Sequence, residues 1–223
     1  MSSAKQNWFA FDWDGTLVDC RERQVAVLSE VLARFSGAAV DLDAWWGRKR
    51  EGMSTQQSLI AGGLTPPVAR AVTGSWIAEV ENERWLKLDV LFPQAVSALN
   101  LVLTQRFAPV VITARRNSER VRSQIRNSSV GKLVEDIWVV NPRDAAQTKG
   151  ELLLQNRVRV FVGDTESDFF AAQMAGTLFG AVSSGQRSAN YLSSAGVPRI
   201  FPDVHAAAMA FVPFPWAIPN SMF

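Results

Sequence analysis

Five short runs of apolar residues constrain the fold of this chain more than any other feature of its sequence. Each run is apolar at consecutive positions, which is typical of strands that are covered on both faces of a parallel sheet. The runs are WFAF (8–11), PVVIT (109–113), DIWVV (136–140), VRVFV (158–162) and TLFGAV (177–182). From about residue 92 they alternate with helical patterns at 93–106 (opening at Pro93), 116–128, 147–155 and 167–175. This alternation predicts an α/β fold, a doubly wound three-layer Rossmann-like parallel sheet.

The region 19–90 breaks the alternation. A first helix is predicted by apolar residues at helical spacing, followed by a glycine stop: Val25, Leu28, Leu32, Phe35 and then Gly37. Further helical stretches are expected at 45–60 and 68–86, around the loop GGLTPP (62–67), and no strand pattern occurs there. We therefore expect a helical cap domain at 19–90, inserted into a core domain formed by 1–18 and 91–223. The proline-rich end, 211–223, is predicted to be irregular.

The composition excludes several kinds of site. Of the 223 residues 48% are hydrophobic, and 23 basic against 21 acidic residues give no argument for nucleic-acid binding. The single cysteine, Cys20, excludes an internal disulfide and a thiolate metal cluster, and His205 is the only histidine. No secretory pattern and no apolar run of about 18 residues is present, so we expect a cytoplasmic protein without a membrane span.

Polar residues follow three of the predicted strands. They are Asp12 and Asp14 after 8–11, Thr113, Ala114 and Arg115 at the end of 109–113, and Asp164 and Asp168 after 158–162, with Lys149 in the preceding helix. Ligands bind outside the carboxyl ends of strands in such sheets, so we expect these residues to meet. Clustered carboxylates need a cation, and oxygen ligands favour magnesium. Each residue alone also fits a turn, a helix cap or a solvated side chain, but the combination favours phosphoryl transfer.

Four stretches resemble motifs of the haloacid dehalogenase-like (HAD) hydrolase superfamily. DWDGTLVD (12–19) matches its first motif, VVITAR (110–115) its second, Lys149 its third and VGDTESDFFAAQMAG (162–176) its fourth. The helical insertion is similar to the cap of the phosphoglycolate-phosphatase-like branch. Gly150 stands where that branch often has a proline after the lysine. The resemblance implies a hydrolase with the fold predicted above.

The resemblance also implies roles for individual residues. Asp12 would be the nucleophile that forms an aspartyl-phosphate, and Asp14 the general acid and then the base, with a pKa raised so that it carries a proton. Magnesium would be held by Asp12, the backbone carbonyl of Asp14 and Asp164, with Asp168 as a ligand through water or as a partner of Lys149. Thr113, the amide of Ala114 and Lys149 would hold the phosphoryl oxygens.

A magnesium-dependent phosphatase acting on a small soluble phosphomonoester is thus the leading interpretation. Phosphoglycolate, a sugar phosphate and a nucleotide are all open as substrates. The alternatives are a phosphomutase of the same superfamily and a catalytically inactive binding protein. The basic cluster Arg48, Lys49 and Arg50 is a candidate for recognising a second anionic group, although it also fits a solvated cluster. Arg115 is expected to border the pocket, and Arg48, Arg50 and Arg115 are the candidates for substrate specificity. Trp45 and Trp46 fit the core of the cap better than a stacking site, and the sequence does not indicate an oligomeric state.

Overall fold

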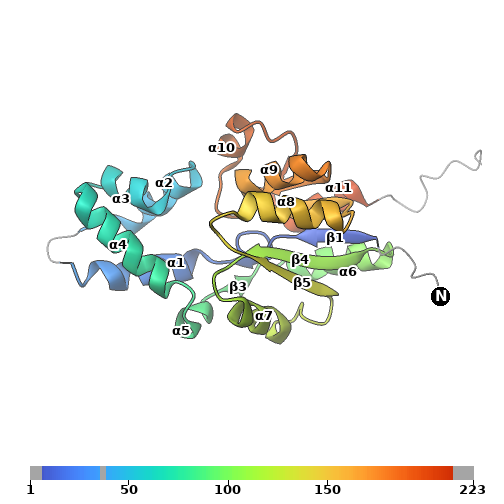
Figure 1. The fold of residues 1–223 in the computed structure, drawn as a ribbon, viewed down its shortest axis with the longest axis horizontal. Helices are drawn as coiled ribbons and strands as arrows, with labels where there is room; N and C mark the ends of the chain where they lie inside the picture. The colour runs from blue at the N-terminus through green and yellow to red at the C-terminus, as the bar shows by residue number, and fades with distance from the viewer. Residues whose placement is uncertain (1–6, 36–38, 213–223) are drawn as a thin grey trace, which may run out of the picture.

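The computed structural model describes residues 7–35 and 39–212, so Gly37 and most of the expected irregular end lie outside the described residues. A six-stranded parallel sheet forms the centre of the molecule (Figure 1), in the order β5-β4-β1-β6-β7-β8. Its strands are β1 (Trp8–Phe11), β4 (Ala108–Ala114), β5 (Asp136–Val140), β6 (Val160–Gly163), β7 (Leu178–Val182) and β8 (Ile200–Phe201). The first five confirm the predicted apolar runs. None of the helices in the described ranges is long and apolar enough to cross a membrane.

Helices cover both faces of this sheet, which confirms the three-layer α/β fold (Figure 1). One face packs on α6 (Ala95–Thr104), α7 (Ser118–Asn127) and α11 (Val204–Phe211). The other packs on α8 (Ala145–Gln155), α9 (Glu166–Ala175) and α10 (Ala189–Ser194). Strand β1 serves both layers, because Phe9 and Phe11 point into the first and Ala10 into the second. Double coverage explains why the strands are continuously apolar.

The inserted region is helical, as predicted, and has an apolar core of its own. It contains α1 (Arg21–Leu32), α2 (Leu42–Arg50), α3 (Thr55–Ala61), α4 (Pro66–Glu79) and α5 (Glu83–Leu86). Trp45 is fully buried in this core and Trp46 nearly so, which confirms them as packing residues. Figure 1 shows these helices beside the end of the sheet to which β4 points. This separate core supports the proposed division into a cap domain, 19–90, and a core domain, 1–18 and 91–223.

Four details of the predicted elements are wrong. The expected helix 45–60 is two helices, because the chain turns at Gly52, whose φ is +87°, and Ser54 caps α3. The helix expected at 68–86 is α4 followed by α5. Helix α6 begins at Ala95, two residues after Pro93. The region 19–90 also contains strand residues: β2 (Val18–Asp19) pairs antiparallel with β3 (Val90–Leu91) where the chain enters and leaves the cap. Strands of two residues are too short to produce a sequence pattern.

Candidate active site

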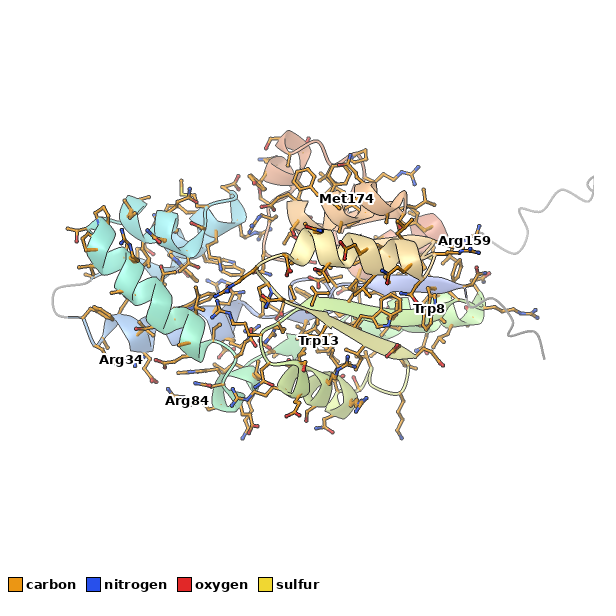
Figure 2. The ribbon with its side chains drawn as sticks, in the orientation of Figure 1. Trp8, Trp13, Arg34, Arg84, Arg159 and Met174 are labelled. Carbon is orange, nitrogen blue, oxygen red and sulfur yellow. The ribbon has the colours of Figure 1, made fainter. Side chains whose placement is uncertain are left out.

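Strand β1 delivers Asp12 and Asp14 to the carboxyl edge of the sheet. The amide of Asp12 still donates to Val162 at 2.8 Å, so this residue continues the pairing with β6. The chain then turns sharply at Gly15, whose φ of +82° favours glycine. Trp13, between the two aspartates, is buried on the α7 side of the sheet (Figure 2), where its indole nitrogen donates to Gln124 at 3.2 Å. Trp13 is therefore a core residue.

Three of the predicted carboxylates come together at this edge. Asp12 at the end of β1, Asp164 after β6 and Asp168 in α9 each offer an oxygen, and these oxygens all lie within 4.8 Å of one another. All three side chains are buried. Lys149 reaches them from α8, and its Nζ donates to Asp12 at 2.9 Å and to Asp168 at 2.6 Å. The structure thus brings together the residues of the first, third and fourth sequence motifs.

Burial of several like charges dominates the electrostatics of this cluster. Burial raises the pKa of Asp12 to about 7; Asp168 adds to this rise, whereas Lys149 opposes it. Burial raises the pKa of Asp164 well above its usual range, with Asp12 and Asp168 as further causes. Burial alone would lower the pKa of Lys149, but its two carboxylate partners raise it instead. A single lysine therefore leaves this group of three carboxylates short of positive charge.

The surroundings of Asp164 and Asp168 fit a small cation. A Cβ added to Gly15 would lie 2.0 Å from Oδ2 of Asp164, and one added to Gly185 would lie 2.3 Å from the same atom. The side chain of Asp168 is held in place by the capping box that it forms with Thr165 at the start of α9. Three buried carboxylates pressed together with one ammonium form an all-oxygen donor set of the kind that Mg²⁺ and Ca²⁺ prefer. The residues present thus fit the magnesium ion that the motif resemblance implies.

Asp14 has the opposite surroundings, and the predicted raised pKa is wrong for this conformation. Arg115 binds its carboxylate with two hydrogen bonds, Nε to Oδ2 at 2.5 Å and a terminal nitrogen to Oδ1 at 2.7 Å. Arg23, from α1 of the cap, donates to Oδ1 as well. Burial would raise the pKa of Asp14, but Arg115 and Arg23 together lower it. Asp14 is therefore held as a carboxylate.

The same ion pairs extend to the junction between cap and core. Asp89, just before β3, accepts from Arg23 at 2.7 Å and from Gln124 at 2.7 Å. Its side chain is almost completely buried. Arg23 also donates to the carbonyl oxygen of Val80 at the end of α4. A terminal nitrogen of Arg115 lies 3.7 Å from a carboxylate oxygen of Asp89, so both guanidinium groups around Asp14 also contact the junction.

The two remaining predicted phosphate-binding residues lie at the end of β4. Thr113 is buried there, two residues after the pair formed by Phe11 and Val111, and so close in register to the end of β1. Ala114 ends the strand and lines a cavity of about 330 Å³ that also contains Asp14. The structure therefore places both residues at the edge of the sheet that carries the carboxylates.

The cap residues that line this cavity do not include Arg48 or Arg50. Arg48 is occupied within the cap, where its Nε donates to the carbonyl and hydroxyl oxygens of Ser58. Arg50 points to the core and donates to the carbonyl oxygen of Ser183 at 2.6 Å. Of the three predicted specificity residues only Arg115 lines the cavity, and the exposed Arg116 beside it lines the cavity as well. The cap residues that do line it include Arg23, Gln24, Lys49 and Trp76.

The sequence pointed to the cluster of residues 48–50 but not to Arg23, Gln24 or Trp76, since helical periodicity does not show which face of a cap helix meets the strand ends of the core. Lys49 lies between two arginines that the sequence favoured equally. Only the register of α2 decides that Lys49 faces the cavity and that its two neighbours do not.

Comparisons with solved structures agree with this architecture. A haloacid dehalogenase-like family hydrolase from Streptococcus pneumoniae has a TM-score of 0.74 and 18% identity, covering 93% of this chain and 99% of that one. A predicted phosphatase from Clostridium acetobutylicum follows at 0.71 and 15%, with 93% and 98% covered. A predicted phosphoglycolate phosphatase from Haemophilus somnus has a TM-score of 0.68 and 16% identity, with 94% and 99% covered.

The chain has the haloacid dehalogenase-like fold. The resemblance noted in the sequence motifs is thereby confirmed at the level of the fold. No protein-family model matches the sequence, and no curated protein matches it. The structural neighbours of this HAD-like fold are named hydrolases and phosphatases. At such low sequence identity, the similarity shows a shared fold only.

Proposed function

We propose that this chain is a magnesium-dependent phosphatase that hydrolyses a small phosphomonoester through an aspartyl-phosphate on Asp12. The observation that carries the proposal is the buried cluster of Asp12, Asp164 and Asp168, with oxygens within 4.8 Å of one another and Lys149 on two of them. Magnesium would be held by Asp12, Asp164 and the carbonyl oxygen of Asp14. Bound there, it would neutralise the phosphoryl oxygens and the carboxylates.

The residues of the chain divide the remaining work. A carboxylate oxygen of Asp12 attacks phosphorus, and the bond from phosphorus to the leaving oxygen breaks. Asp14 protonates that oxygen, and then takes a proton from the water that hydrolyses the aspartyl-phosphate. Thr113, the amide of Ala114 and Lys149 hold the phosphoryl oxygens. Lys149 also fixes the carboxylate of Asp12, and Asp168 in turn holds Lys149 at 2.6 Å.

The ion pairs of Asp14 favour its role as a base in the observed conformation. With Arg115 and Arg23 lowering its pKa, Asp14 is a carboxylate that can accept a proton from water. To donate a proton to the leaving oxygen, it must first lose part of this interaction. Because Arg23 belongs to the cap, movement of the cap would weaken the pairing and raise the pKa of Asp14.

The size of the cavity supports a small substrate. A volume of about 330 Å³ suits a phosphorylated metabolite rather than a macromolecule. One structural neighbour is named as a predicted phosphoglycolate phosphatase, which favours that type of phosphomonoester, while sugar phosphates and nucleotides stay open.

A screen of phosphorylated metabolites for phosphate release tests the proposal. We expect release with Mg²⁺, loss of release with EDTA, and recovery when Mg²⁺ is restored in excess. Isomerised phosphoester with little free phosphate would indicate a phosphomutase instead. No turnover across a wide panel, with the protein folded, would contradict the proposal and favour a binding protein.

Replacing Asp12, the proposed nucleophile, tests the same proposal by mutagenesis. We expect Asp12→Asn to lower kcat by at least about a thousandfold, because an amide cannot form the aspartyl-phosphate. The variant should keep its far-ultraviolet circular dichroism and a cooperative melt. Wild-type turnover by well-purified Asp12→Asn would exclude Asp12 as the nucleophile.

A further inference from the structure

Lys49 is a buried cation in the cavity beside Asp14, and within the described residues no carboxylate lies within ion-pair distance of it. Its side chain is only 7% exposed. Burying an ammonium group costs several kcal/mol unless other groups compensate. The other buried cations near the site are compensated, since Arg23 and Arg115 bind Asp14, and Lys149 binds two carboxylates.

Neutral groups of the cap surround Lys49 instead. Its Nζ donates to Oε1 of Gln24 at 2.5 Å. The same nitrogen lies 5.0 Å from the ring centre of Trp45, 5.8 Å from that of Trp46 and 4.9 Å from that of Trp76. Each ring attracts a cation by about 0.5–2 kcal/mol without neutralising it. Of the three N–H donors of the Lys49 ammonium, one is used by Gln24 and two are left for a ligand. The positive charge of Lys49 is not neutralised by these neighbours.

Residues from several elements hold the ammonium group of Lys49 in place. Gln24, on α1, is fixed by a hydrogen bond from its Nε2 to Gln186 of the core at 3.0 Å. Trp76, on α4, donates from its indole nitrogen to the backbone carbonyl of Gln24 at 3.0 Å. Helices α1 and α4 therefore converge on Lys49, which is the next-to-last residue of α2 and lines the cavity.

The carboxylates that line the cavity are already engaged. Asp14 is bound by two arginines, and Glu81 accepts from the backbone amides of Arg116 at 3.1 Å and Asn117 at 2.9 Å. Among the described residues none of these acids is available to Lys49. A ligand that brings its own negative charge would complete the cavity electrostatically.

We infer that Lys49 binds a second anionic group, a carboxylate or a second phosphate, carried by the leaving group of the substrate. This inference rests on the proposed function and narrows it to phosphomonoesters with two anionic groups. An anionic oxygen would accept from the free donors of Lys49 beside the rings of Trp45, Trp46 and Trp76. A charge-assisted bond of this kind is worth about 10- to 100-fold in affinity.

Three phosphomonoesters with a two-carbon backbone test the inference in steady-state kinetics. 2-Phosphoglycolate carries a carboxylate, ethane-1,2-diyl bisphosphate a second phosphate, and 2-hydroxyethyl phosphate no second anion. We expect the wild type to prefer one of the first two over the third. Lys49→Met should reduce this preference in kcat/KM by about tenfold or more, chiefly through KM. The preferred ester identifies which anion Lys49 binds, and Lys87→Met, which removes an exposed lysine of the cap, should keep the wild-type preference.

A binding measurement separates this inference from the proposed hydrolysis. In Asp12→Asn with Mg²⁺, quenching of tryptophan fluorescence by 2-phosphoglycolate or the bisphosphate should give a Kd, and adding Lys49→Met should weaken it about tenfold. Binding that depends on Lys49 without turnover in the wild type would uphold the inference and overturn the phosphatase. Turnover with equal losses on all three esters in Lys49→Met, or no preference in the wild type, would overturn the inference and leave the phosphatase standing.

Discussion

At the scale of single residues, Asp12 and Asp14 are separated by one tryptophan and have opposite electrostatic surroundings. Burial, with a neighbouring carboxylate, raises the pKa of Asp12, whereas the two arginines around Asp14 lower the pKa of Asp14. The spacing of the pair was readable in the sequence, and so was the chemistry it favours. The pairing of Asp14 with two arginines could not be read from the sequence. Arg115 was interpreted as a substrate-binding residue, and no sequence pattern pointed to Arg23.

Lys149 allows a direct test of the carboxylate cluster. We expect Lys149→Met to destabilise the magnesium-free protein by about 3–5 kcal/mol, because Asp12 and Asp168 would stay buried without a cation. Urea unfolding followed by tryptophan fluorescence measures this change. Lys132→Met, at an exposed position, is the matched control and should unfold like the wild type. A variant at position 149 as stable as that control would show that the cluster is not held by this lysine.

Replacing Lys49 should stabilise the protein, whereas replacing Lys149 should destabilise it. Burial lowers its pKa from 10.5 to about 7, so the folded state binds a proton there more weakly than the unfolded state. This penalty is full below about pH 7 and disappears as the pH rises toward 10.5. Lys49→Met should therefore raise the free energy of unfolding at pH 7 by about 1–3 kcal/mol, whereas Lys87→Met should not. A loss of stability in urea unfolding would instead show that Lys49 serves the packing of the cap.

At the scale of elements, the turn that leaves β1 couples backbone geometry to the carboxylates. Gly15 has a φ of +82°, and a Cβ there would lie 2.0 Å from Asp164. Gly63 offers a matched control, since its φ is +100° but a Cβ would have no neighbour within 4 Å. We expect both alanine variants to lose about 1–2 kcal/mol of stability through backbone strain.

The two glycine variants should differ in metal binding. Only Gly15→Ala displaces Asp164, so only this variant should lose its affinity for Mg²⁺, by about tenfold or more in calorimetric titration. Phosphate release by Gly15→Ala should fall together with its magnesium affinity. Gly63→Ala should keep the wild-type magnesium affinity and the wild-type phosphate release. Equal magnesium affinity in the two variants would show that Asp164 is not a ligand.

Elements differ in how well the sequence predicted them, for a physical reason. A buried strand such as β6 shows itself, because both of its faces must be apolar. The motif residues at its end follow, since the ends of parallel strands share an edge. The break between α2 and α3 depends on one glycine and one cap, and β2 and β3 have two residues each, so neither produces a periodic signal. The face that α2 presents to the cavity is fixed by packing between helices distant in sequence.

At the scale of the whole molecule, the buried acids should link folding to pH and to magnesium. Asp12, Asp164 and Asp89 all have a raised pKa in the folded state, largely through burial. The folded protein therefore binds more protons than the unfolded chain above the ordinary value of 3.8. Their stabilising contribution is full below that value and is lost as the pH rises through the folded pKa of each group, which is about 7 for Asp12. Asp14 acts in the opposite sense, but only below 3.8, because its folded pKa is lowered.

We therefore expect the melting temperature of the magnesium-free protein to fall between pH 4.5 and pH 7.5. The drop corresponds to a few kcal/mol, since one unit of pKa is worth about 1.4 kcal/mol. Saturating Mg²⁺ binds the ionised carboxylates, so it should raise the melting temperature more at pH 7.5 than at pH 5. Differential scanning fluorimetry with EDTA or Mg²⁺ across this range measures both effects. A magnesium shift independent of pH would mean that the ion binds away from the buried acids, because protons and the metal would then not compete for the same oxygens.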